Sequence, residues 1–135
     1  MRRNTTIFII LLIGGLFLLG PVSAASVIDK GSKNVTVQKD VFYHTYKWTT
    51  YKYSNYHTKT VLTNTPYILG TPYWAIKNVI DIKKVSTNKL VVAETITSAS
   101  GKTTTYKHYF KYNGANAVKF YKYVFKEQLL KPYLR

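Results

Sequence analysis

The side chains that could carry acid–base chemistry are few in this chain of 135 residues, and they are scattered. A glycosidase needs two carboxyl groups about 5–10 Å apart, one as an acid and the other as a base or nucleophile. No two acids lie close in sequence, and Asp40 with Glu94 is the pair that a fold could bring together. We expect solvated or salt-bridged carboxylates instead. The five acids are Asp29, Asp40, Asp81, Glu94 and Glu127.

Three histidines could in principle bind a metal ion, but their spacing does not favour it. His44, His57 and His108 show no H-x-x-x-H pattern, and the chain has no cysteine. A structural zinc site needs four ligands, and a catalytic one needs three and a water. We expect these histidines to pack among tyrosines. Since no G-x-S-x-G motif or glycine-rich phosphate loop occurs either, the sequence predicts no metal, no cofactor and no enzyme activity.

Aromatic residues are the informative feature, and 13 of them are tyrosines. Tyrosine suits interfaces because its ring packs while its hydroxyl stays hydrogen-bonded. The stretch 43–53 places rings beside lysines, so sugars could stack there and anionic groups could be held. The alternative is that Tyr and Thr simply favour strands. The candidate ligand or subunit contacts are Tyr43, Tyr46, Trp48, Tyr51, Lys52 and Tyr53.

The N-terminus has the three-part pattern of a secretory signal peptide. Two arginines precede an apolar run over residues 7–19, which is followed by a Gly-Pro pair and small residues up to Ala25. The run is shorter than the ~20 residues needed to cross a bilayer, so we favour a cleaved leader over an uncleaved anchor. Cleavage after Ala24 or Ala25 fits equally. We therefore predict a secreted or cell-surface protein, with a signal peptide over 1–25, one domain over 26–135 and no membrane span after cleavage.

The charge of the predicted mature chain narrows its partners. Because Arg2 and Arg3 fall in the leader, 18 of the 20 Lys plus Arg remain against 5 acids, a net charge of +13, and all but Arg135 are lysines. Arginine is the usual bidentate reader of phosphates and base edges, so a nucleic-acid binder is disfavoured. A diffuse positive surface suits anionic wall polymers, lipid head groups or acidic glycans, and solubility alone explains it equally well. Asn34-Val35-Thr36 is also an N-glycosylation motif, which predicts a glycoprotein if Asn34 is used.

Alternation with a period of two predicts strands along most of the mature chain. Apolar and aromatic residues at 42, 44, 46 and 48 predict a strand with one aromatic face, and a turn at Ser54-Asn55 leads to a second strand over 59–63. The segments 90–97 and 104–112 alternate on either side of a glycine-containing loop, which predicts a β-hairpin.

Other segments carry turn or mixed signals. Asn64-Thr65-Pro66, Gly70-Thr71-Pro72 and Asn113-Gly114 predict turns. The segment 73–82 fits a helix or a strand, with the strand slightly favoured. The remaining expected elements are a third meander strand over 118–125 and a short helix within 126–134.

Five to seven short strands without βαβ alternation predict an all-β, mainly antiparallel domain, similar to a small β-sandwich and with room for one short helix. Because no disulfide is possible, packing and hydrogen bonding must stabilise it.

In layout the chain resembles the small secreted fimbrial or adhesin-like subunits of methanogenic archaea. The resemblance rests on the leader Met1–Ala25, the length, the absence of cysteine, and Thr-, Tyr- and Lys-rich strands such as Thr103–Tyr112. It implies a filament-forming subunit that mediates attachment to surfaces, and it carries over no functional residue.

Two functions follow as expectations. The first is a fimbrial or other surface-assembly subunit that self-associates and mediates adhesion, with Ser26–Lys39 exchanged between subunits as a strand. The alternative is a monomeric secreted module that binds an anionic cell-wall polymer or glycan through the 43–53 stretch and nearby lysines. A membrane-active toxin is a third and weaker expectation, because only 118–130 could supply an amphipathic helix.

Overall fold

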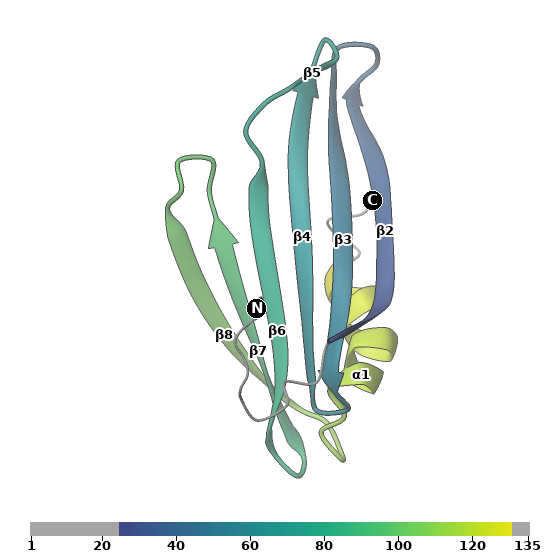
Figure 1. The fold of residues 1–135 in the computed structure, drawn as a ribbon, viewed down its shortest axis with the longest axis vertical. Helices are drawn as coiled ribbons and strands as arrows, with labels where there is room; N and C mark the ends of the chain where they lie inside the picture. The colour runs from purple at the N-terminus through teal and green to yellow at the C-terminus, as the bar shows by residue number, and fades with distance from the viewer. Residues whose placement is uncertain (1–24, 131–135) are drawn as a thin grey trace, which may run out of the picture.

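The computed structural model describes residues 25–130, so the predicted signal peptide lies outside the described residues except for its last alanine. Within these residues, seven strands are followed by a helix near the C-terminus (Figure 1). In chain order the elements are β2 (Ser26–Gln38), β3 (Phe42–Ser54), β4 (His57–Ile68), β5 (Thr71–Pro72), β6 (Ile76–Ser86), β7 (Lys89–Thr97), β8 (Thr103–Lys111), α1 (Ala117–Phe120) and η1 (Tyr121–Leu130).

All seven strands belong to one antiparallel sheet. Its order is β2-β3-β4-β6-β7-β8, and the short β5 pairs with the end of β4. Apart from β5, strands that follow one another in the chain are therefore neighbours in the sheet, as in a meander. The prediction of a small, mainly antiparallel all-β domain with one short helix is confirmed, and the layer that packs against the sheet is the helix.

The C-terminal helix consists of α1 and η1, which is wound as a π-helix. The side chain of Asn116 caps its start by accepting a hydrogen bond from the backbone N–H of Lys119 at 3.0 Å. The predicted strand over 118–125 is therefore wrong, because the buried residues of this segment recur at helical spacing. They are Ala117, Phe120, Tyr121 and Phe125. The predicted tail helix starts earlier than expected, and residues 131–134 lie outside the described residues.

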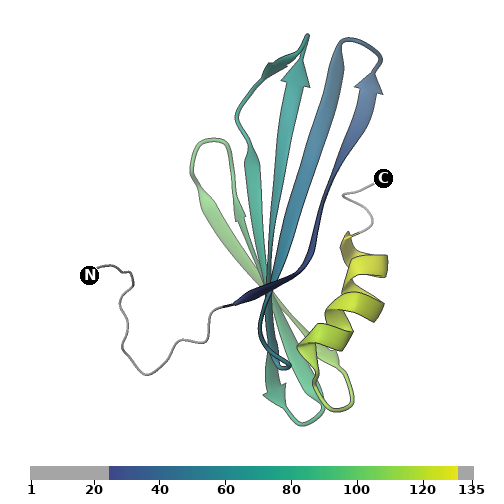
Figure 2. The same ribbon diagram turned by 45° about the vertical axis from the view of Figure 1, so that its right-hand side comes forward.

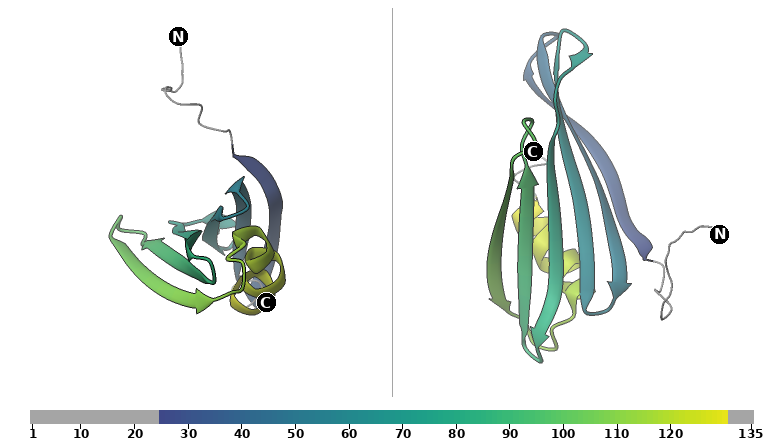
Figure 3. Two further views of the ribbon diagram at one scale, coloured as in Figure 1. Left: turned by 90° about the horizontal axis from the view of Figure 1, so that it is seen from below. Right: turned by 60° about the vertical axis from the view of Figure 1, so that its left-hand side comes forward.

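The sheet curls around this helix, and the core fills the space between them (Figure 3). Because strands favour one buried face, the core takes every second residue of the central strands. The helix runs beside only one half of the sheet, so the ends of β3 and β4 extend past it (Figure 2). The core residues are Leu62, Ile80, Ile82, Leu90, Val92, Ala115, Ala117, Phe120, Tyr121 and Phe125.

The local predictions held where alternation was regular. The hairpin of β7 and β8 pairs without a register shift, and residues 76–82 of the undecided segment 73–82 lie in strand β6. The turns predicted at Ser54-Asn55 and Asn113-Gly114 are also confirmed. The turn predicted at Gly70-Thr71-Pro72 lies one residue earlier, at Leu69-Gly70, because Thr71 and Pro72 form the short strand β5.

The turn predicted at Asn64-Thr65-Pro66 is wrong, since these residues lie within β4. Pro66 is tolerated there because its backbone polar atoms face away from β3. Its carbonyl accepts a hydrogen bond from the N–H of Tyr73 on the opposite side of β4. The pairing of β4 with β6 has already ended at Asn64. A proline without an N–H costs the β3–β4 ladder nothing at such a position.

Within residues 25–130, no helix has both the length and the apolar character needed to cross a membrane.

Candidate binding surfaces

The sheet has two faces that differ in chemistry. The inner face is formed by side chains that point toward the C-terminal helix, such as Thr50, Thr60 and Ile80, which lie opposite one another on three neighbouring strands. The outer face is formed by the alternate side chains, which point away from the helix. Directly paired residues share a face, so the strand register assigns each side chain to one of them.

The predicted contact residues divide between these two faces. Tyr43, Tyr51 and Tyr53 lie on the outer face, whereas Tyr46, Trp48 and Lys52 lie at inner positions of the same strand. The structure therefore does not bring the six together. The cause is local, since successive side chains of a strand point to opposite sides.

The outer face is strongly cationic. Its only carboxylate among the described residues is Asp81, which lies 3.0 Å from Nε2 of His57. Eight lysines share this face, and they are Lys30, Lys47, Lys59, Lys77, Lys83, Lys89, Lys107 and Lys111.

Tyrosine rings lie between these lysines. Tyr43 and Tyr67 stack across β3 and β4 with ring centroids 4.9 Å apart and nearly parallel planes. The ammonium of Lys59 lies 5.8 Å from the centroid of the Tyr53 ring, within the range of a cation–π contact. The outer face thus places tyrosine rings beside ammonium groups.

On the inner face, a row of rings runs along β3 past the end of the helix. Phe42 and His44 have ring centroids 4.9 Å apart, and His44 and Tyr46 lie 6.0 Å apart. Trp48 is the next residue of the row and packs against the core. This confirms the strand with one aromatic face that the alternation predicts.

Beside this row the inner face forms a pocket of about 210 Å³, which we call the inner pocket. Two hydrogen bonds fix polar groups near it: Nδ1 of His44 contacts Oδ1 of Asn64 at 2.9 Å, and Nδ2 of Asn78 donates to Glu94 at 3.2 Å. The pocket is lined by Tyr46, Leu62, Asn64, Ile76, Asn78 and Ile96.

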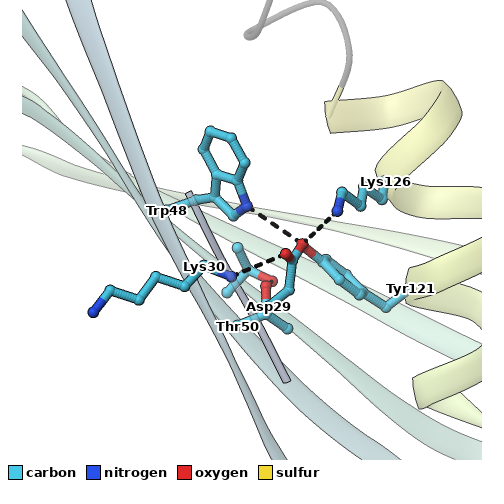
Figure 4. Close-up of polar contacts among 7 residues, drawn as sticks. Asp29, Lys30, Trp48, Thr50, Tyr121 and Lys126 are labelled. Atoms are coloured by element: carbon cyan, nitrogen blue, oxygen red, sulfur yellow. Dashed lines mark hydrogen bonds and ion pairs between the residues drawn. The ribbon is translucent and has the colours of Figure 1, made fainter. Parts of the chain in front are cut away.

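At the edge of the inner face, the carboxylate of Asp29 joins β2 to the C-terminal helix (Figure 4). Its Oδ2 accepts hydrogen bonds from the Tyr121 hydroxyl at 2.6 Å and from Nε1 of Trp48 at 3.3 Å, and the Lys126 ammonium lies 3.0 Å away. Its Oδ1 accepts from the backbone N–H of Lys30 at 2.9 Å. We call Asp29, Trp48, Tyr121 and Lys126 the Asp29 cluster.

Two pKa values in the Asp29 cluster depart from their ordinary values. Burial by itself would raise the pKa of Asp29, but the hydrogen bond from Tyr121 and the bond and charge of Lys126 outweigh it, so this pKa is lowered. Burial, together with the hydrogen bond to Asp29, raises the pKa of Tyr121 far above its ordinary value. Both shifts favour the state in which Asp29 is charged and Tyr121 is neutral. The cluster therefore stabilises the fold and offers no acid–base pair near neutral pH.

The other acids and histidines that were considered for catalysis or metal binding are spread over the sheet and its turns. Asp40 lies in the turn between β2 and β3, while Glu94 lies within β7 beside Asn78. His44 contacts Asn64, and His108 lies on the edge strand β8. Among residues 25–130, no three His, Cys, Asp or Glu side chains gather as metal ligands would. Asn34, the predicted glycosylation site, is exposed on β2, and its Oδ1 accepts a hydrogen bond from Thr45.

Comparison of the chain with protein-family models, with curated proteins and with solved structures finds no match.

Proposed function

We propose that this protein is an exported module that binds an anionic cell-wall polymer or glycan on the outer face of its sheet. The observation that carries the proposal is the eight lysines of this face against the single carboxylate of Asp81. One carboxylate against eight ammonium groups offsets little of the positive field.

The arrangement suits an extended polyanion better than a small ligand. The lysines are spread over β2, β3, β4, β6, β7 and β8, and nearly all are exposed. A chain of regularly spaced phosphates or carboxylates could contact several of them at once, with rings such as Tyr43 and Tyr51 in contact with its sugars. Attraction of this kind is screened within about 10 Å at 0.1 M salt, so binding should weaken as salt is added.

The test compares two triple variants of the exported chain that have the same net charge. Lys30→Gln, Lys47→Gln and Lys77→Gln remove charge from the outer face, and Lys33→Gln, Lys119→Gln and Lys122→Gln remove it elsewhere. Binding to a polyuronate and to a glycerol-phosphate polymer is measured by calorimetry at low salt.

We expect the outer-face triple to bind at least about tenfold more weakly, which corresponds to about 1.4 kcal/mol, and the control triple to change little. Equal losses in the two triples would mean that net charge alone attracts the polymer, and the outer face would lose its role.

A second candidate is the surface-assembly subunit that mediates adhesion, and the edges of the sheet favour it. Among the described residues, β2 and β8 each pair on one side only, and such edges can add a strand from another molecule. Head-to-tail pairing of β2 with β8 would continue the sheet into a filament. Exchange of Ser26–Lys39 would place β2 of one subunit beside β3 of the next.

Three features make this second candidate less favoured. β2 contains two register shifts, both edge strands carry lysines, and subunits of high positive charge repel one another. Size-exclusion chromatography with electron microscopy separates the candidates, since filaments support assembly and a monomer that binds wall polymer supports the module.

A further inference from the structure

The inner pocket lies on the opposite side of the sheet from the lysines of the outer face, so attraction of a polyanion does not account for it. Its lining combines three kinds of group in a small volume. Leu62, which is 2 % exposed, belongs to the core, while Ile76 is 40 % exposed. Tyr46 contributes a ring, and Asn64 and Asn78 contribute amides.

The two amides each have a polar atom that no bond to a described residue uses. Asn64 contacts His44 through Oδ1, which leaves its NH₂ group as a donor. Asn78 donates to Glu94 through Nδ2, which leaves its Oδ1 as an acceptor. Buried or half-buried amides of this kind require a hydrogen-bonding partner in any ligand that displaces water.

These groups match the parts of one chemical unit. An acetamido group has a carbonyl that can accept from Asn64, an N–H that can donate to Asn78, and a methyl that can contact Leu62, Ile76 and Ile96. The apolar face of the sugar ring that carries it can lie against Tyr46. A volume of about 210 Å³ suits a single sugar residue, and the ring row of β3 continues beside it toward Phe42.

Two other ligand classes fit less well. An acyl chain would cover the amides of Asn64 and Asn78 without giving them a hydrogen bond, which is costly. A hexose without an acetyl group has no methyl for the aliphatic side chains. We propose that the inner pocket binds an N-acetylhexosamine residue of a glycan through its acetamido group. This goes beyond binding of a polyanion, since it places a neutral sugar on the other face and the outer lysines take no part in it.

The test measures binding of the β-1,4-linked trimer of N-acetylglucosamine to the exported chain by calorimetry. The matched ligands are cellotriose, which lacks the acetamido group, and the fully deacetylated trimer. We expect the acetylated trimer to bind at least about tenfold more tightly than either, since buried amides left unpaired reject the analogues. We also expect its affinity to change little between about 0.05 M and about 0.5 M salt, unlike that of a polyanion.

Two variants locate the site. Ile76→Trp fills the pocket from its exposed rim, and Tyr46→Ala removes the ring, while Tyr56→Ala removes an exposed ring from the turn between β3 and β4 as a control. We expect a loss of at least about tenfold for the first two and no loss for the control. Thermal unfolding checks that each variant is folded. If Tyr46→Ala does not fold, the result for Ile76→Trp alone decides whether the pocket is the binding site.

The proposal is overturned if the acetylated trimer does not bind, if cellotriose binds as well, or if Ile76→Trp binds as tightly as the unchanged chain. These outcomes are independent of the lysine variants, so failure here leaves the outer face to be judged on its own test.

Discussion

Asp29 holds together parts of the chain that are far apart in sequence. Its carboxylate is 18 % exposed and lies between the edge strand β2 and the C-terminal helix, where Tyr121 and Lys126 both reach it. Since a hydrogen bond to a charged group contributes more than a neutral one, this single side chain links β2 to the core.

Replacing Asp29 by Asn keeps the shape of the side chain but removes the charge. We expect Asp29→Asn to lower the free energy of unfolding by about 2 kcal/mol, because Lys126 loses its partner and the Tyr121 hydroxyl loses its strong acceptor. Urea denaturation at neutral pH measures this. The matched control is Asp40→Asn, since Asp40 is exposed in a turn at a φ of 61° that asparagine also adopts. If Asp40→Asn lowers the free energy of unfolding by a similar amount, the role of the Asp29 cluster is contradicted.

The lowered pKa of Asp29 also sets an acid dependence of stability. A folded pKa below the unfolded value of about 3.9 means that the stabilisation is present above that pH and is lost as the pH falls through the folded pKa. We expect Asp29→Asn to reduce the difference in unfolding free energy between pH 6 and pH 3, measured with the same urea titrations. An unchanged pH dependence would show that the carboxylate is not stabilised in the folded state.

Tyr121 sets the opposite dependence on the alkaline side. Its pKa is raised in the fold, so its contribution is present below the unfolded pKa of about 10 and is lost as the pH rises above it. Tyr121→Phe should cost about 1 kcal/mol at neutral pH through the lost hydrogen bond and should flatten the fall in stability between about pH 9 and about pH 11. Tyr123→Phe is the control, because Tyr123 is 69 % exposed on the same helix.

At the scale of elements, the pairing of β2 with β3 depends on a glycine. Gly31 lies opposite Trp48, and a Cβ at this position would overlap the indole ring. Gly31→Ala should therefore destabilise the fold by about 1–3 kcal/mol, as overpacking does. In a double-mutant cycle with Trp48→Leu, the combined loss should be smaller than the sum of the single losses, and additive losses would show that the two residues do not interact.

The elements that were predicted correctly are those whose alternation is regular over a whole strand. β7 and β8 are the clearest case, since both have an unbroken period of two around a glycine loop. The first part of the helix, over residues 118–125, was predicted as a strand because Tyr121, Tyr123 and Phe125 imitate that period. Only the burial of Phe120 beside Tyr121, with the cap at Asn116, reveals the helical spacing.

The candidate sites were less accessible to sequence reasoning than the strands. That Tyr43 and Tyr46 face opposite ways follows from alternation alone and could have been deduced. The inner pocket could not, because it needs the register of β3, β4, β6 and β7 to place Tyr46, Asn64, Asn78 and Ile96 side by side. The bond between Asp29 and Tyr121 spans 92 residues and has no local signal.

The whole molecule combines two properties that act against each other. Its sheet has edges at β2 and β8 that could pair with another molecule, and β8 has no register shift, proline or glycine to prevent it. Its lysines, with few acids to offset them, make molecules of this charge repel one another at a distance. Which property dominates depends on salt, because the Debye length falls from about 10 Å at 0.1 M to about 3 Å at 1 M.

This competition leads to a prediction about self-association. We expect the chain from Ser26 onward to be monomeric at about 0.05 M salt and to associate, in a concentration-dependent way, at about 1 M salt, where repulsion is screened and the β8 edge becomes available. Sedimentation velocity at both salt concentrations measures this. Tyr106→Lys is the decisive variant, since Tyr106 is half exposed at an inner position of β8 and a charge pointing inward there protects an edge. If the unchanged chain and Tyr106→Lys associate equally at high salt, the contact between molecules does not involve β8. Association at low salt would mean that the attraction between molecules already exceeds the repulsion of their lysines. That result would favour the assembly subunit over the binding module.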